Sequence, residues 1–142
     1  MISKARPAAG MGAESHLAFE KEIYMMFTED GYNLVKVFHL SGKIMGGPET
    51  QLLCNRFKEV IDSGTELMVI DFRNVRWINS LGIGTIIGCL TTLRKRGGDV
   101  RFANLRGAAR HYFHVTKIDT VVEVFESVEE AVASFAGETS GL

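Results

Sequence analysis

The sequence lacks three features that would place it in a common functional class. It has no excess of positive charge to attract nucleic acid, because its 142 residues include 16 Lys and Arg against 17 Asp and Glu. It has no run of the roughly eighteen consecutive apolar residues that a membrane span needs. Its first residues, MISKARPAAGMGAESH, have no apolar core of a secretory signal. These absences predict a cytoplasmic protein that binds neither nucleic acid nor membranes. The first twenty or so residues show no hydrophobic period, which leaves Met11 as an alternative native start.

Cysteine and histidine are also scarce. Cys54 and Cys89 each stand in an apolar, helix-like stretch, which favours reduced core thiols over a disulfide in a cytoplasmic protein. His111 and His114 have helical spacing, but no carboxylate or thiolate nearby completes a recognisable metal-binding spacing. We therefore predict no metal site, no cofactor and no redox role.

What is present is an alternation of strand-like and helix-like segments. The first two strands flank a turn containing Asp30 and Gly31, which is a hairpin signal. Strands are then predicted at 67–72, 99–104 and 121–125, and helices from Pro48 to the DSG at 62–64, at 81–96, at 107–115 and from the capping-box SVEE at 127–130 to Phe135. The pattern predicts one α/β domain over residues 23–136, with a mixed sheet of four to five strands and about four helices packed against it. Residues 1–22 are predicted to be a flexible lead-in, and residues 137–142 a disordered tail.

The stretch WINSLGIGTIIG at 77–88 is open to several interpretations. Structurally, Ser80 would cap a helix while Gly84 and Gly88 let it pack closely on the sheet. A nucleotide site would use the glycines at 82, 84 and 88, but they form GxGxxxG and no Walker lysine follows. A nucleophilic role for Ser80 lacks the GxSxG elbow and an obvious partner base or acid. A small nucleotide-binding protein stays as the alternative from another functional class.

Three segments, VIDFRNVRWINSLGIGTIIG, RKRGGDVRFANL and DTVVEVFESVEEAV, together resemble the STAS domain of bacterial anti-sigma factor antagonists. That family shows a strand ending in Asp, an aromatic-containing loop, and Asp-Ser-Ser/Thr-Gly-Leu-Gly opening a helix. The resemblance extends from about Ile23 to Phe135 and implies a STAS fold without enzymatic activity. It further implies partner switching: the unphosphorylated antagonist binds an anti-sigma factor, usually a serine kinase of the histidine-kinase-like ATPase class. Phosphorylation of the second hydroxyl residue of the motif ends that binding.

The sequence departs from the family motif at its regulatory position. Aligning Gly82 and Gly84 with the family glycines puts Asn79 where Asp is usual, Ser80 on the first serine and Leu81 on the phosphoacceptor. Leucine cannot be phosphorylated, so the resemblance implies an antagonist without the usual off-switch. Ser80, one residue away, is the alternative acceptor.

Leu81 is predicted to share an exposed apolar contact patch with Ile83, the alternative being that it packs under the loop. On the family plan, the glycine-rich loop SGKIMGGP and the loop ANLRG flank the same surface. The predicted partner-binding residues are Asn79, Ser80, Leu81, Gly82, Ile83, Gly84, Gly42, Gly46, Gly47 and Asn104. The expected state is a monomer or weak dimer. A STAS scaffold or sensor component of a larger regulatory assembly is the alternative within the same class.

Overall fold

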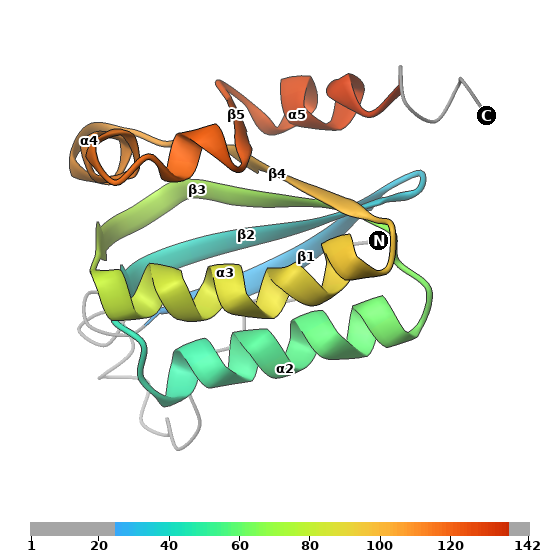
Figure 1. Cartoon of the computed structure of the whole chain (residues 1–142), viewed down its shortest axis with the longest axis horizontal. Coiled ribbons are helices and arrows are strands. Elements are labelled where there is room, and N and C mark those ends of the chain that lie inside the picture. Colours follow the sequence, from blue (N-terminus) through green and yellow to red (C-terminus); the bar gives the residue numbers. More distant parts are fainter. Residues whose placement is uncertain (1–24, 137–142) are drawn as a thin grey trace, which may run out of the picture.

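The protein forms a five-stranded mixed sheet with helices on both faces (Figure 1). The mixed sheet of four to five strands with helices packed against it, which the sequence pattern predicted, is confirmed. The computed structural model describes residues 25–136, so the predicted lead-in at 1–22 and tail at 137–142 lie outside them. The strand order is β1-β2-β3-β4-β5, with β1 antiparallel to β2 and the other neighbours parallel. The strands are β1 Met26–Tyr32, β2 Val35–Ile44, β3 Leu67–Ile78, β4 Asp99–Ala103 and β5 Glu123–Phe125. The helices are α2 Pro48–Asp62, α3 Ser80–Lys95, α4 Gly107–Val115, the short 3-10 helix η2 Ile118–Thr120 and α5 Val128–Ser134.

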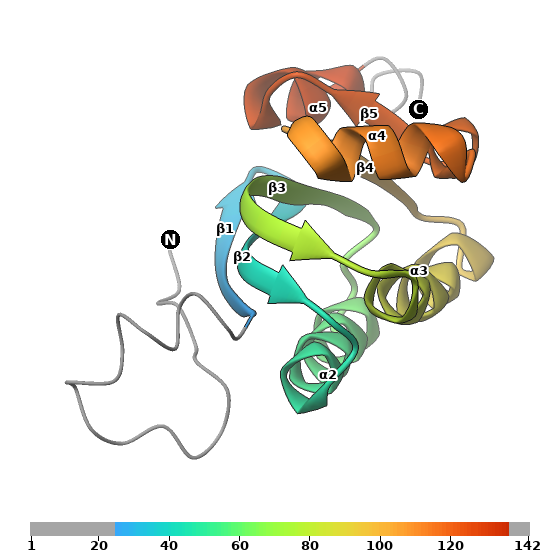
Figure 2. The same cartoon turned by 90° about the vertical axis from the view of Figure 1, so that its left-hand side faces the viewer.

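Each face of the sheet has its own hydrophobic core, because successive residues of a strand point to opposite faces. Helices α2 and α3 run side by side along one face (Figures 1 and 2). Their core includes Phe38, Phe57, Ile70, Ile86 and Phe102, and Phe113 of α4 joins it by ring contacts with Phe72 and Phe102. Helix α5 covers part of the other face, over Val37, Val69 and Ala103. Among the described residues, no helix is both long and apolar enough to cross a membrane.

The predicted hairpin is present, but its turn lies further along the chain than expected. Strand β1 continues through Asp30 and Gly31 to Tyr32, which pairs with Val35. The turn is formed by Asn33 and Leu34, and Asn33 has a φ of 58°, a conformation that asparagine tolerates better than most residues. The Asp-Gly signal was wrong here because Asp30 is used as a strand residue whose carboxylate contacts a neighbouring strand.

Strand β3 is also longer than predicted, because its pairing with β2 resumes beyond an irregularity and reaches Ile44 opposite Ile78. Gly42, predicted to lie in the glycine-rich loop, is therefore a buried residue of β2. It has a φ of 86° next to the register shift between Gly42 and Lys43, a backbone conformation that favours glycine. The loop itself is limited to residues 45–47.

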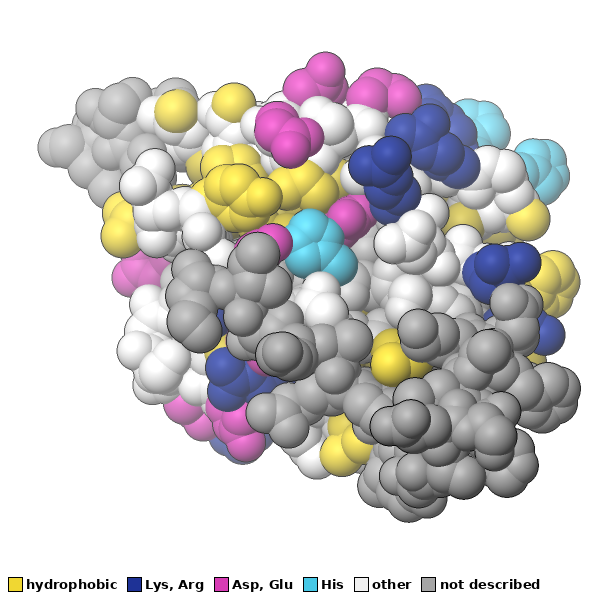
Figure 3. Space-filling view, turned by 180° about the vertical axis from the view of Figure 1, so that it is seen from behind, with side chains coloured by type: hydrophobic (Ala, Val, Ile, Leu, Met, Phe, Trp, Pro, Cys, Tyr) yellow, Lys and Arg dark blue, Asp and Glu magenta, His cyan; other side chains and the backbone are white. Residues whose placement is uncertain are grey.

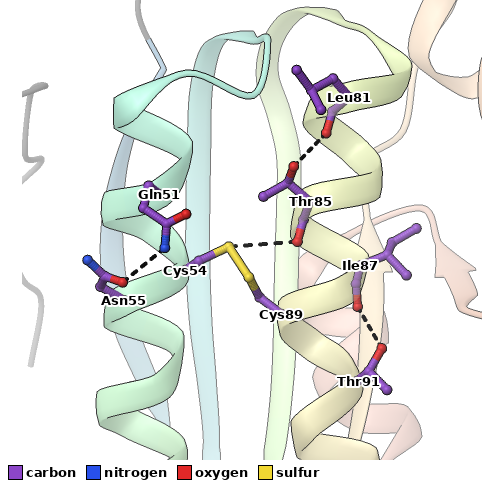
Figure 4. The surroundings of a disulfide bond; sticks show 8 residues. All are labelled: Gln51, Cys54, Asn55, Leu81, Thr85, Ile87, Cys89 and Thr91. Atoms are coloured by element: carbon purple, nitrogen blue, oxygen red, sulfur yellow. Dashed lines mark hydrogen bonds between the residues drawn. A yellow bond between two sulfur atoms is a disulfide. The ribbon is translucent and has the colours of Figure 1, made fainter.

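The prediction of two reduced core thiols is wrong. Cys54 of α2 and Cys89 of α3 are joined by a disulfide, with their Cα atoms 5.7 Å apart (Figure 4). The sequence placed each cysteine in an apolar, helix-like stretch, but it does not say which residues of two helices face one another. Within residues 25–136, no group of three or more His, Cys, Asp or Glu is arranged to hold a metal ion.

Candidate partner-binding site

The start of helix α3 is built on Asn79. Strand β3 ends at Ile78, and the Asn79 side chain accepts a hydrogen bond from the Gly82 amide at 2.7 Å, so Asn79 is the N-cap. The Asn79 backbone amide donates a hydrogen bond to the Ile44 carbonyl at 3.1 Å, which joins the start of α3 to the end of β2. The predicted cap, Ser80, is instead the first helical residue and is exposed. The predicted N-cap was one residue too far along the chain, because the side chains of Asn79 and Ser80 can both accept a hydrogen bond from the first turn of a helix.

Gly82 fixes the distance between α3 and β2. It is buried, and a Cβ at this position would overlap the Ile44 carbonyl group. A Cβ at Gly84 or Gly88 would meet nothing within 4 Å. The close approach of α3 to β2 therefore depends on Gly82. The predicted role of Gly84 and Gly88 in close packing is wrong.

Leu81 is the most exposed large apolar side chain at this end of the sheet, with 63% of its surface accessible. It lies beside Gly46, where an added Cβ would come within 2.6 Å of Leu81 Cγ. Met45, in the same loop, is 40% exposed. Ile83, by contrast, is only 2% exposed and belongs to the core, so the predicted shared patch of Leu81 and Ile83 is wrong.

The structure thus brings two of the predicted segments together at the carboxyl ends of β2 and β3, the end turned toward the viewer in Figure 2. We call this surface the docking face, formed by Met45, Gly46, Gly47, Ser80, Leu81 and Gly84. Trp77, which sequence reasoning did not select, is 50% exposed at its margin. Trp77 points away from the side of β3 on which Ile78 is buried.

Asn104 is not part of the docking face. It is buried, and its side-chain amide donates to Asp71 Oδ1 at 2.8 Å. Asp71 Oδ2 lies 2.7 Å from His39 Nδ1, and His39 Nε2 lies 2.9 Å from Asp30 Oδ2. We call these four residues the His39 cluster. They lie on the sheet face that α5 covers in part, where Figure 3 shows a histidine between acidic side chains beneath a group of hydrophobic ones.

The charges of the His39 cluster stabilise one another. The hydrogen bond to Asp71 raises the pKa of His39 against the opposing effect of burial, and Asp30 raises it further. Burial pushes the pKa of Asp71 upward, but hydrogen bonds from His39, Asn104 and the Arg73 amide outweigh this and hold it below its usual value. The protonated imidazole can donate to both carboxylates at once.

Sequence reasoning missed the His39 cluster, although one signal was present. Asp71 is a polar residue inside the apolar run LMVIDF, and a charge buried in a central strand needs partners. Strand alternation puts Asp71 on the face of Val69, but the register that aligns it with His39 required the structure.

The glycines considered for a nucleotide site lie inside helix α3, since the turn between β3 and α3 consists of Asn79 alone. Dinucleotide sites place glycines in the turn that leaves the strand. The Gly82 amide, moreover, is occupied by its cap.

The family model for the STAS domain matches residues 27–131, which include the docking face and all residues of the five strands except Met26. The chain belongs to the STAS domain family. No curated protein matches it.

Solved structures with the STAS fold are similar over most of the chain. A Thermotoga maritima protein named as an anti-sigma factor antagonist shares 18% identity at a TM-score of 0.69, covering 76% of this chain and 92% of its own. An anti-sigma factor antagonist from Mycobacterium paratuberculosis shares 22% identity at 0.66, covering 78% and 92%. The phosphorylated form of the Bacillus cell fate determinant SpoIIAA shares 17% identity at 0.61, covering 76% and 97%. At these sequence identities, the structural similarity shows a shared fold and no more.

Proposed function

We propose that this STAS domain is a bacterial, cytoplasmic anti-sigma factor antagonist that regulates transcription by partner switching and has no catalytic activity of its own. Its docking face would bind an anti-sigma factor that is also a serine kinase of the histidine-kinase-like ATPase class. The observation that carries the proposal is the exposed Leu81 at the capped start of α3, beside Gly46 of the loop at 45–47. An apolar side chain held in the open on a rigid helix end is suited to burial against a partner.

The structure also suggests why phosphorylation at this position would work as a switch in a relative that carries a hydroxyl there. The first turn of α3 contains no acidic residue, and the amides of a helix start favour an added phosphate. The same added charge, about −1.5 to −2, would oppose burial of the surface in an apolar interface. SpoIIAA is a relative with a phosphorylated form. In this chain Leu81 replaces the acceptor, so we propose that binding continues without that control.

The test is to rebuild the switch with Leu81→Ser. The partner is first recovered from an extract of the native organism, identified by mass spectrometry and purified. Wild type, Leu81→Ser and Ser80→Ala are then incubated with it and ATP, and their intact masses are measured. We expect one phosphate on Leu81→Ser and none on the other two, because the Asn79 cap and Gly82 contact that orient the position are unchanged.

Two results would overturn the proposal. A phosphate on wild type that disappears in Ser80→Ala would show that Ser80 has taken over the acceptor role and that control is retained. Recovery of other STAS proteins alone, with no ATPase, would favour a scaffold or sensor component of a larger assembly.

A further inference from the structure

The cysteine pair of α2 and α3 lies in an open groove. The groove has a volume of about 280 Å³ and is lined by Gln51, Cys54, Asn55, Lys58, Ile61, Asp62, Cys89 and Thr92. Cys54 is 4% exposed, whereas Cys89 is only partly buried. A small thiol or disulfide can therefore approach Cys89 from the groove. Accessible disulfides of this kind exchange more readily than enclosed structural ones.

The surroundings of Cys54 accommodate the reduced form as well. Its sulfur lies 3.7 Å from the Thr85 carbonyl oxygen, which is an acceptor for the thiol proton (Figure 4). The facing helices remain packed through buried side chains of α2 and α3 such as Leu53 and Ile86. When the disulfide is opened, the buried sulfur of Cys54 therefore has the Thr85 carbonyl as a hydrogen-bond acceptor.

The pair is also connected to the docking face. Leu81, Thr85 and Cys89 follow one another at four-residue steps along α3, as Figure 4 shows, and the Thr85 hydroxyl donates to the Leu81 carbonyl at 2.7 Å. Leu81 and Cys89 are eight positions apart along the helix, a distance of about 12 Å. On the other side, α2 begins directly after the loop at 45–47. A covalent link here restrains α3, whose start carries Ser80 and Leu81, and α2, which begins directly after the docking-face loop.

From these observations we propose that Cys54 and Cys89 form a reversible dithiol/disulfide site whose substrate is a low-molecular-weight disulfide, and that its oxidation rigidifies the docking face. The consequence for partner affinity rests on the proposed function, whereas the chemistry of the site does not.

The reaction is a pair of thiol–disulfide exchanges. The Cys89 thiolate attacks one sulfur of the external disulfide, forming a mixed disulfide and releasing one small thiolate. The Cys54 thiolate then attacks Cys89 Sγ and releases the second. The two protons of the cysteines end on the two small thiols, so the external disulfide is reduced as the protein is oxidised.

The first arm of the test follows this chemistry in the full chain without any partner. The protein is reduced with dithiothreitol, which is then removed by desalting. It is next treated with oxidised glutathione, and its intact mass is measured by mass spectrometry. We expect wild type to lose two hydrogen atoms without a lasting glutathione adduct, and dithiothreitol to restore them under native conditions. Cys54→Ala should keep one glutathione on Cys89, whereas Cys89→Ala should acquire much less because Cys54 is buried. Thiols that stay free in oxidised glutathione, or a disulfide that native dithiothreitol does not open, would overturn the redox site.

The second arm compares amide hydrogen exchange at residues 45–47 and 79–85 in the oxidised and reduced protein. We expect exchange to be slower by about threefold or more in the oxidised form, since a restrained segment opens less often. The double variant Cys54→Ala, Cys89→Ala should exchange at the same rate in either buffer, because it can form neither the disulfide nor a glutathione adduct. Equal exchange in both redox states of wild type would overturn the link to the docking face. The oxidised form should also bind the purified partner more tightly than the reduced form does. If the two forms bind equally while the exchange rates differ as expected, the result counts against the proposed function and not against the redox site.

Discussion

The docking face and the His39 cluster differ in where their side chains find partners. The His39 cluster pairs its charges inside the chain, because the carboxylates of Asp30 and Asp71 both contact the imidazole and the Asn104 side chain donates to Asp71. The docking face leaves Leu81 and Met45 exposed, while its supporting contacts are made by backbone groups and the Asn79 cap. A group whose partners are all internal contributes to the fold, whereas an apolar side chain held outside it is available for binding.

Gly82→Ala should cause the largest loss, because it breaks the support of the docking face. The new methyl would overlap the Ile44 carbonyl group, and α3 or β2 would have to shift. We expect the free energy of unfolding to fall by about 2 kcal/mol or more. The measurement is urea unfolding followed by circular dichroism.

Gly84→Ala is the matched control for Gly82→Ala, since it adds the same methyl two residues away in open space. It should be neutral or stabilise the protein by roughly 0.5 kcal/mol, because alanine is the better helix former. Equal unfolding energies for the two variants would contradict the role given to Gly82.

Leu81→Asp tests whether the exposed leucine is part of the partner interface. A carboxylate buried there without a counter-charge should weaken binding at least tenfold, about 1.4 kcal/mol. The fold should be unaffected, since acidic residues are favourable in the first turn of a helix. Calorimetry with the purified partner measures the binding. The control is Leu34→Asp, at a 75% exposed position in the hairpin turn. If both variants bind equally well, Leu81 lies outside the interface.

The His39 cluster should produce a smaller, pH-dependent effect on stability. The pKa of His39 is raised in the folded protein, so its contribution is complete below the unfolded value of about 6.5 and is lost as the pH rises through the folded value. The lowered pKa of Asp71 acts in the opposite direction, and its contribution is lost as the pH falls below the usual carboxyl range. Unfolding energies measured from about pH 6 to about pH 9 should decline in wild type.

His39→Gln should remove most of this decline while leaving partner affinity within about twofold, since the cluster is separate from the docking face. His111→Gln, at an exposed histidine of α4, is the control and should keep the wild-type slope. A changed affinity in His39→Gln would connect the cluster to binding and remove the distinction between the two regions.

The sequence was sufficient for the order of strands and helices, and it selected the two segments, 45–47 and the start of α3, that the structure brings together. Local signals predicted helix α4 over residues 107–115 and the cap of α5 at Ser127, because helix periods and caps depend on neighbouring residues. It was insufficient wherever contacts join distant segments. The burial of Ile83, the use of Asn104 by Asp71 and the pairing of Cys54 with Cys89 all depend on register or helix packing. The same holds for the strand position of Gly42, which follows from pairing beyond a bulge.

The carbonyl group of Ile44 has a consequence for how this surface can change during evolution. It accepts the Asn79 amide and lies against Gly82, so these two positions are constrained on either side of Ser80 and Leu81. The two residues between them point outward and carry none of that constraint. Under the proposed function, a lineage could therefore exchange a regulated side chain for an unregulated one, and back again, by single substitutions at these two positions. Control over binding would then change without any change in the fold that presents it.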